Sequence, residues 1–365
     1  MFDRRLATNF DWWFAATILG MACLGILTIY SANSLAQSTF RRTLYLRQVT
    51  WVGMGLVTMV AACLVSYRTL ARFAYLIFGL SMVMLVLVLV IGKAGLGAHR
   101  WIRIGGFAFQ PSEFAKLGLV LFLARYFDDH RGSLHEPRTM LVPAVLTGLC
   151  MLLVLKQPDL GTALLLLFIA LSLMLLVGLH WRYLAPFAIG GAAVAPLLWM
   201  VLKDYQRRRI LVFLNPDLDP LGAGYHIAQS KIAVGSGGAF GKGWLAASQS
   251  QLNFLPLNHT DFIFAVLAEQ WGFLGCLLVL LAYFYLITKG FQIAQDCTDL
   301  FAALLATGIS AMVAIQVLIN AAMVLGIMPV VGIPLPLLSY GGSSFLVTML
   351  CLGLLLNIHM RRFMY

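Results

Sequence analysis

Ten long apolar segments recur along the chain, and few charges interrupt them. An α-helix rises about 1.5 Å per residue, so segments of this length can cross a hydrocarbon layer about 30 Å thick. Hydrophobic residues make up 61% of the 365 residues and charged residues only 11%, which excludes a water-soluble fold. The chain is therefore predicted to be an integral membrane protein, with spans near residues 12–30, 49–66, 73–91, 112–127, 140–155, 162–179, 184–202, 262–288, 301–326 and 343–360.

The fold class follows from the lack of water in lipid. An open sheet edge would leave backbone amides and carbonyls without partners there, so helices are the expected spanning elements. We therefore predict an all-α integral membrane protein of about ten transmembrane helices, forming one polytopic domain over residues 1–365. The first span follows Arg4 and Arg5 and leads into a many-spanning chain, so it is interpreted as a retained helix rather than a cleaved signal.

Basic residues in the connectors predict the orientation. With the N-terminus inside, eleven Lys and Arg residues lie on the cytoplasmic side and seven on the outer side, once the long loop is left out of the count. Both termini are therefore predicted to be cytoplasmic, and the long loop of residues 203–261, between the seventh and eighth spans, to be extracytoplasmic. The basic residues outside that loop on the outer face favour an anionic partner there; they are Arg41, Arg42, Arg47, Lys93, Arg100, Arg103 and Lys156.

Four polar segments mark the starts of the fourth, sixth, eighth and tenth spans, and helix parity places all four at the outer surface. Pro, Ser, Thr and Asp at a helix start are ordinary N-terminal chemistry, which satisfies unpaired amides and complements the helix dipole. Ionisable residues within membrane segments are also costly and indicate functional sites. Four such segments together favour function over capping; they are Gln110–Glu113, Gln157–Gly161, His259–Asp261 and Leu338–Ser344.

These segments contain three candidate carboxylates, Glu113, Asp159 and Asp261. Each can be a helix cap or a functional group, and both interpretations stay open for each residue taken singly. Glu113 lies three residues before Lys116, a spacing that predicts an ion pair on one helix face. Asp261 ends the long polar loop at the mouth of an apolar helix, which places a candidate catalytic acid or base at the membrane surface.

The long loop also holds a glycine-rich stretch, residues 235–243, which follows Lys231 and contains Lys242. It is not a nucleotide-binding P-loop, because Ser236 stands where that motif requires glycine and Gly243 where it requires Ser or Thr. Its amides could face phosphate with the two lysines as point charges, or it could be a simple surface loop. Ser343, at the start of the tenth span, offers a second candidate anion site or a tight packing turn.

Three further groups of polar residues have ordinary interpretations. Asp217 and Asp219 could contribute to a divalent-cation site, but Asx-Pro sequences of this kind are typical of turns. Arg207–Arg209 directly follow the seventh span, where anchoring to lipid headgroups is expected. Gln316 and Asn320 lie four residues apart in the ninth span, a spacing that predicts hydrogen bonds between helices.

Several long motifs, taken in order, resemble those of the SEDS family of bacterial membrane proteins. They cover nearly the whole chain and are Gln110–Lys116, Lys156–Gly161, Phe213–Pro216, Gln229–Gly243, His259–Ala265 and Pro334–Ser344. Within the family, Asp219–His226 and Gly332–Pro336 resemble the elongation members rather than the division members. Several motifs in order are far more specific than any one of them.

The resemblance implies a ten-helix enzyme of the bacterial inner membrane that polymerises lipid II into peptidoglycan glycan strands. It implies Asp261 as the catalytic carboxylate, with Glu113, Lys116 and Asp159 as important polar residues. It also implies a class B penicillin-binding protein transpeptidase and other membrane proteins of the elongation machinery as partners, and no nucleic acid. Two places depart from the family pattern: Leu257-Asn258 stands where relatives often carry an acid and a base, and Gln270 where they often carry Glu.

The chemistry of such a reaction fits these residues. The donor sugar of lipid II leaves with a pyrophosphate that is already negative, so one base that deprotonates the acceptor hydroxyl can suffice. Lys, Arg, backbone amides or a bound Mg²⁺ or Mn²⁺ would stabilise the charge on the leaving group, so no cofactor is required although a divalent cation is compatible. Attack opposite the leaving group would invert the anomeric carbon.

Two other classes of function stay open. A lipid II flippase or other transporter would also use carboxylates within a helical bundle, but near the bilayer midplane and with broken helices or inverted repeats. No repeat is visible in the sequence. A non-catalytic scaffold for a wall synthase would need neither Asp261 nor the glycine-rich stretch.

Overall fold

The structure is a computed structural model that describes residues 9–34, 39–95, 98–104, 107–134, 136–179, 204–215, 218–219, 222–246, 249, 254–255 and 258–362. The helices are α2 (Trp12–Asn33), α3 (Thr39–Arg42), α4 (Leu44–Leu64), α5 (Tyr67–Ile91), α6 (Pro111–Asp129), η1 (Arg131–Ser133), α7 (Pro137–Lys156), α8 (Leu160–Val177), α10 (Asp204–Leu214), α11 (Ala223–Ser236), α13 (Ile263–Asp296), α14 (Leu300–Val324) and α15 (Gly342–Arg361). The strands are β1 (Lys93–Gly95), β2 (Ala98–Ile104) and β3 (Phe107–Phe109).

Among the described residues, eight helices are long and apolar enough to span a membrane: α2, α4, α5, α7, α8, α13, α14 and α15. They match eight of the ten predicted spans, which confirms a multi-pass helical membrane protein. The fourth predicted span is α6, whose 19 residues reach about 28 Å but include Glu113, Lys116 and three charges in its last turns. Glu113 and Lys116 are buried in the bundle and do not face lipid, whereas Arg125, Asp128 and Asp129 form ion pairs with one another at the end of the helix. The predicted span at 184–202 lies outside the described residues.

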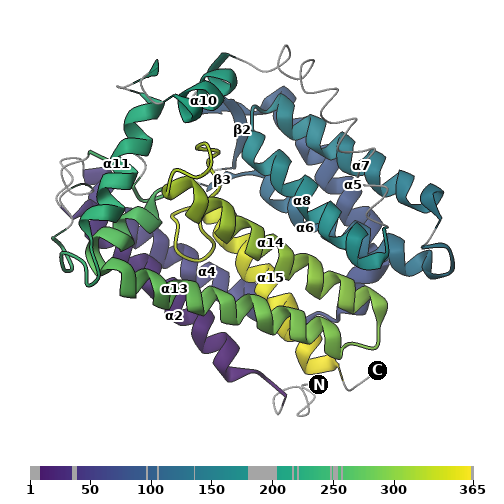
Figure 1. Ribbon diagram of the computed structural model, residues 1–365. Coiled ribbons are helices and arrows are strands. Elements are labelled where there is room, and N and C mark those ends of the chain that lie inside the picture. The colour runs from purple at the N-terminus through teal and green to yellow at the C-terminus, as the bar shows by residue number, and fades with distance from the viewer. Residues whose placement is uncertain are drawn as a thin grey trace.

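The helices α14 and α15 form the centre of the bundle. α14 packs against α13, α6 and α8, and α15 packs against α4, α14 and α6. In the apolar windows of these two helices 78% and 83% of the residues are buried, against 28% in α4 and in α5. Figure 1 shows α14 and α15 in the middle of the bundle. The exposed apolar faces of α4 and α5 therefore face lipid.

The start of α2 and the end of α15 lie at the same end of the bundle (Figure 1). Asp11, which caps α2, forms an ion pair of 2.9 Å with Lys289 near the end of α13. Asn357 in the last turns of α15 donates to the carbonyls of Ala62 and Cys63 at the end of α4, at 2.9 and 2.8 Å. The predicted parity of the spans agrees with this arrangement, and the assignment of this end to the cytoplasm stays a prediction.

A small three-stranded sheet, which the sequence did not predict, lies between α5 and α6. Its antiparallel strands have the order β1-β2-β3, with Lys93 opposite Trp101 and Ile102 opposite Phe109. The sheet lies in the connector between two helices and not in a predicted span. The argument against sheet edges holds only where lipid replaces water, so a connector can hold a short sheet.

The helix α13, which covers the predicted span at 262–288, contains a break. Its backbone leaves the helical conformation at Gly272 (φ 65°, ψ −163°). The glycine-rich stretch that follows α11 enters this break: the amides of Lys242 and Gly243 donate to the carbonyls of Glu269 and Gln270, at 2.9 and 3.1 Å. In return, the amides of Phe273 and Leu274 donate to the carbonyls of Gly238 and Ala239, at 2.8 and 3.1 Å. The loop thus replaces the missing helical turn.

Candidate active site

The turn of residues 258–262, which carries Asp261, is held by hydrogen bonds to three consecutive carbonyls. The Tyr340 amide donates to the His259 carbonyl at 2.8 Å, and the Ser339 hydroxyl donates to the Thr260 carbonyl at 2.7 Å. The Asn320 side-chain amide donates to the Asp261 carbonyl at 3.0 Å and to the Ile333 carbonyl at 2.8 Å. Because α14 and the loop before α15 both bind this turn, the backbone at Asp261 is fixed.

The Asp261 carboxylate itself does not cap α13. That helix begins after Phe262, and no side chain makes a cap hydrogen bond there. The loop before α15 passes close to the carboxylate at Gly332, where an added Cβ would lie 3.7 Å from Asp261 Oδ2 and where φ is +76°. A side chain at position 332 would be strained by this positive φ, and its Cβ would be in van der Waals contact with the carboxylate.

Burial raises the pKa of the Asp261 carboxyl from its ordinary value of 3.8 to about 6. The charge of Asp159 raises this pKa further, whereas Arg209 and Arg100 act to lower it. These four side chains, from four different segments of the chain, therefore act on one another electrostatically. A carboxyl with a pKa of about 6 is mostly ionised at neutral pH but still a better proton acceptor than an ordinary aspartate.

Both arginines near Asp261 are held by backbone carbonyls. Arg100 Nε donates to the Gln157 carbonyl at 2.9 Å, and its guanidinium also donates to the Pro158 carbonyl. Arg209 Nη1 donates to the Val330 carbonyl at 3.1 Å. The two arginines line one small cavity together with Pro158, Leu160, Ile210, Pro329, Val330 and Val331. The sequence analysis did not select them: Arg100 was one of several outer basic residues and Arg209 a headgroup anchor, and only their placement in the fold distinguishes them.

Asp159 is a helix cap and also part of a polar network. Its carboxylate accepts from the Thr162 amide at 3.3 Å and the Thr162 hydroxyl at 3.0 Å, which caps α8. Gln110 Nε2 donates to Asp159 Oδ2 at 3.4 Å and to the Ser112 hydroxyl at 3.0 Å. The segments that start α6 and α8 are thus joined beside Asp261.

The predicted ion pair between Glu113 and Lys116 is present, with 2.7 Å between Oε2 and Nζ. Both side chains are buried in the first turns of α6, at 4% and 2% exposure. Two charges withdrawn from water in this way must remain together, because either one alone would be strongly destabilising. The pair follows Ser112 directly, so it lies next to the Asp159 network along the chain.

Ser343 joins the start of α15 to the segment before α6. Its hydroxyl accepts from the Gln110 amide at 3.1 Å and donates to the Ala108 carbonyl at 3.1 Å. A Cβ added at the neighbouring Gly342 would lie 2.3 Å from the Trp51 ring, so the backbone packs tightly there. These contacts favour the packing-turn interpretation of this segment over an anion cradle. All four predicted outer segments nevertheless meet around one region of the fold.

The two lysines of the long loop have different surroundings. Lys242 Nζ forms an ion pair of 2.9 Å with Glu269 Oε1, and the Glu269 side chain is fully buried. Lys231 is exposed on α11, and an added Cβ at Gly326 would lie 2.1 Å from its Cε. The amides of Lys242 and Gly243 are bonded to α13, which favours a structural role for the glycine-rich stretch over a phosphate cradle.

The remaining polar candidates carry no cation site in the described part of the chain. Asp219 forms an ion pair of 3.2 Å with Arg208, and its carbonyl accepts from the Gly222 amide in a turn, as the turn interpretation predicts. Asp217 lies outside the described residues. No cluster of three or more His, Cys, Asp or Glu side chains that could hold a metal occurs among the described residues. Burial lowers the pKa of His259 to about 4, so this imidazole is neutral at neutral pH.

Comparison with known proteins gives consistent matches over almost the full length. The family FTSW_RODA_SPOVE, described as a cell cycle protein, matches residues 11–363. Peptidoglycan glycosyltransferase MrdB of Escherichia coli (strain K12) is 44% identical over 319 residues, which cover 87% of this chain and 85% of the relative. Peptidoglycan glycosyltransferase RodA of Treponema pallidum (strain Nichols) is 35% identical and covers 98% of this chain and 99% of its own. A solved chain from a peptidoglycan synthase complex that coordinates polymerization and crosslinking superposes with a TM-score of 0.84, at 35% identity over 98% of this chain and 99% of that chain.

Proposed function

The chain belongs to the FtsW/RodA/SpoVE family, also known as SEDS, and is a multi-pass membrane peptidoglycan glycosyltransferase; we propose that Asp261 is the base with which it polymerises lipid II. The reaction takes place on the outer face of the bacterial cytoplasmic membrane. The observation that carries this proposal is a carboxylate of raised pKa, on a turn fixed by three backbone contacts, with two arginines acting on it. A base, an anion-binding group and a rigid frame are what the reaction needs.

In this reaction the Asp261 carboxylate removes the proton from the acceptor hydroxyl. The freed oxygen attacks the anomeric carbon of the donor sugar, and the bond from that carbon to the pyrophosphate oxygen breaks. Undecaprenyl pyrophosphate leaves with the electron pair, and the α-linked donor becomes a β-linked polymer. Arg100 and Arg209 are suited to the pyrophosphate, because guanidinium groups offer paired donors to phosphate oxygens.

The other candidate residues support the site in separate ways. Asp159 acts through its charge on Asp261 and through the network that joins α6 to α8. The buried Glu113–Lys116 pair and Ser343 hold the start of α6 in place beside that network. Lys231, which is exposed on α11 in the outer segment, contributes a substrate contact in this proposal.

The proposal further assigns the enzyme to cell elongation, with a class B penicillin-binding protein transpeptidase as its partner. The 44% identity to MrdB supports this branch, although the family description covers both FtsW and RodA. The similarity to a chain from a synthase complex of polymerization and crosslinking supports a crosslinking partner. Depletion in a rod-shaped host should therefore give round cells. Filaments with blocked division would assign the chain to the division branch.

One structural feature bears on the alternative of lipid II transport. The broken helix α13 is of the kind that transporters use, since unwound backbone can bind a substrate or ion. Here the backbone groups at the break are bonded to the glycine-rich stretch, so they are not offered to a ligand. This supports catalysis over transport.

The test is incubation of the purified chain with fluorescent lipid II, with and without the transpeptidase, followed by sizing of the glycan product. Asp261→Asn keeps the shape of the side chain but removes the base, so the rate should fall about 100-fold or more while the melting temperature is retained. Asp219→Asn is the matched control, because it changes an aspartate of the same segment that pairs with Arg208 in a turn. Polymerisation by Asp261→Asn at a near wild-type rate would remove Asp261 as the base. Lipid II transfer across vesicles by that variant would then favour the transporter.

A further inference from the structure

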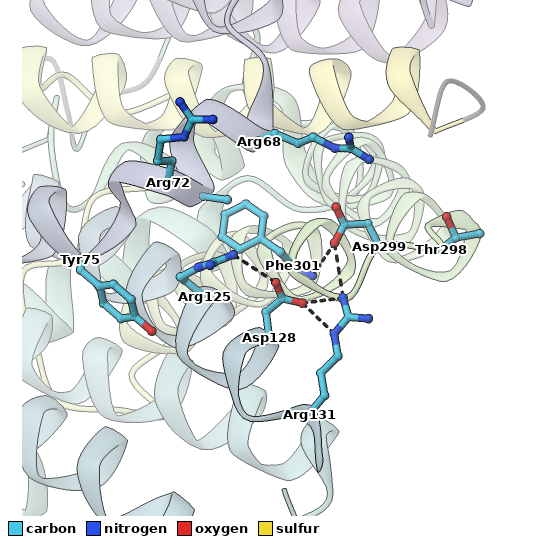
Figure 2. Close-up of a pocket in the computed structure, with 10 residues that line it drawn as sticks. Arg68, Arg72, Tyr75, Arg125, Asp128, Arg131, Thr298, Asp299 and Phe301 are labelled. Atoms are coloured by element: carbon cyan, nitrogen blue, oxygen red, sulfur yellow. Dashed lines mark hydrogen bonds and ion pairs between the residues drawn. The ribbon is translucent and has the colours of Figure 1, made fainter. Parts of the chain in front are cut away.

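A cavity of about 700 Å³ lies at the end of the bundle opposite Asp261. Asp261 contacts Asn320 near the end of α14, whereas the cavity is lined by Asp299, which caps the start of α14. Figure 2 shows side chains from the first turns of α5, the end of α6 and the connector between α13 and α14 gathered around it. The start of α5, the end of α6 and the connector before α14 thus surround one space. By the predicted orientation this face of the bundle is cytoplasmic.

The lining of the cavity is mainly basic. It includes four arginines, Arg68, Arg72, Arg125 and Arg131, against two aspartates, Asp128 and Asp299. The positive-inside rule accounts for basic residues at this face, but it does not require them to enclose a cavity. A space lined by one sign of charge concentrates ions of the opposite sign.

Two of these arginines are held by carboxylates. Arg125 forms ion pairs of 3.4 Å with Asp128 and 2.8 Å with Asp129. Arg131 lies 2.5 Å from Asp128 and 3.7 Å from Asp299, as the dashed lines in Figure 2 show. The opposite charges within these pairs neutralise one another, and the pairs hold in place the side of the cavity formed by the end of α6 and the start of α14. The aspartates are therefore engaged with Arg125 and Arg131.

The other two arginines stand on α5. Arg68 and Arg72 are one helical turn apart, and both border the cavity across from the ion pairs (Figure 2). Within the described part of the chain, no carboxylate lies within ion-pair distance of Arg72, which is exposed. Tyr75, one turn further on, also lines the cavity and donates to Asp129 at 2.7 Å. The first turns of α5 thus supply two guanidinium groups at the edge of the cavity, and Figure 2 shows that of Arg72 directed away from the ion pairs.

The same helix presents lipid-facing side chains directly beside these arginines. Phe73, Leu76 and Leu80 are 47%, 66% and 54% exposed. A glycerophospholipid could therefore place its headgroup in the cavity and its acyl chains along α5. Arginine is suited to such a headgroup, because its planar fork binds phosphate oxygens through two hydrogen bonds.

We propose that this cavity binds a phosphate-bearing anion through Arg68 and Arg72, supplied either by an anionic lipid headgroup of the adjacent leaflet or by free phosphate. The proposal does not rest on the catalytic role of Asp261. The ligand binds the first turns of α5, in the space beside the end of α6 and the start of α14. Its binding therefore stabilises the bundle at the face away from the active site.

The test measures the melting temperature of the full chain in zwitterionic detergent during titration with dioctanoyl phosphatidylglycerol, dioctanoyl phosphatidylcholine or inorganic phosphate. Phosphatidylglycerol should raise the melting temperature saturably, and phosphatidylcholine should not. The double variant Arg68→Gln/Arg72→Gln should bind about tenfold more weakly or worse. Arg138→Gln is the matched control, because it removes one exposed arginine at the start of α7 that does not line the cavity.

The outcomes distinguish a lipid headgroup from free phosphate as the source of the anion, and both from the absence of an anion site. Inorganic phosphate that stabilises the chain and competes with phosphatidylglycerol would support the site with a soluble ligand. Phosphatidylglycerol alone would support the lipid. The proposal would be overturned if neither phosphatidylglycerol nor inorganic phosphate raised the melting temperature saturably. It would also be overturned if Arg138→Gln weakened binding as much as the double variant does, or if an acidic peptide bound where both phosphate probes fail. If the double variant does not fold, Arg72→Lys keeps the charge but loses the fork, and binding should fall severalfold.

Discussion

The pairing of Lys242 with Glu269 leads to a prediction that separates a structural lysine from a phosphate-binding one. Glu269 is fully buried in α13, and Lys242 Nζ lies 2.9 Å from its Oε1. Removal of one partner of a buried pair costs about 3–5 kcal/mol, because the other charge stays unpaired. The Lys242 side chain is 32% exposed, and the Gln249 amide also donates to Glu269 Oε1 at 3.1 Å, so water and a second donor reduce the loss. We expect about 2 kcal/mol for Lys242→Ala.

The assay is thermal unfolding in detergent, followed by tryptophan fluorescence, with lipid II polymerisation measured on the same preparations. Lys242→Ala should melt a few degrees below the wild type. The double variant Lys242→Ala/Glu269→Gln should recover much of the loss, because it no longer leaves a buried charge unpaired. Lys231→Ala is the control, since Lys231 is exposed on α11 and its removal should leave the melting temperature unchanged.

Two results would refute this reasoning. One is a Lys242→Ala variant that melts with the wild type but shows a raised KM for lipid II, as loss of a phosphate contact predicts. The other is a double variant that is less stable than either single variant. Either result would support a substrate-binding role for Lys242.

Four further predictions follow from the site and from the broken helix. The acid limb of kcat/KM should have an apparent pKa of about 6, because only ionised Asp261 accepts a proton; a limb near 4 would contradict the burial of this group. The pKa of Asp261 in the folded state lies above the ordinary 3.8. The free energy of unfolding of the wild type, compared with that of Asp261→Asn, should therefore rise as the pH falls from about 6 to about 4, by at most about 3 kcal/mol in unfolding experiments. Gly241→Ala should abolish monodisperse folded protein on size exclusion, because φ is +80° and the new Cβ would lie 2.1 Å from the Gln270 carbonyl oxygen; Gly235→Ala, with open space around it, should fold normally. Asn320→Ala should lower kcat about tenfold with little change in lipid II binding, because it frees the Asp261 carbonyl; an unchanged kcat in steady-state assays would show that the other two contacts suffice.

Local pattern was enough to predict much of this fold. Apolar segment length placed the spanning helices, because a lipid-embedded helix needs a minimum run of apolar residues. The spacing of Glu113 and Lys116 predicted their ion pair, because residues three apart share a helix face. Helix parity placed four polar segments at one end of the bundle, where the structure joins them by hydrogen bonds.

The features that local pattern could not predict depend on contacts between distant segments. Arg100 and Arg209 resemble other outer arginines until the fold brings them to Asp261. Lys242 gains a buried partner 27 residues away, and Asn320 binds two loop carbonyls rather than a neighbouring helix. The break at Gly272 has no signal of its own, since a single glycine in an apolar run is equally compatible with an unbroken helix.

The break in α13 determines how a movement of α11 is transmitted to α13. Four backbone hydrogen bonds join the stretch after α11 to α13 across Gly272. Each such hydrogen bond contributes about 0.5–1.5 kcal/mol net, so extraction of the stretch, which breaks all four, is a rare event. α11 and the short segment of α13 from Ile263 to the break at Gly272 are therefore mechanically coupled. A protein that pulls or tilts α11 from outside the membrane exerts its force on the helix whose first residues follow Asp261.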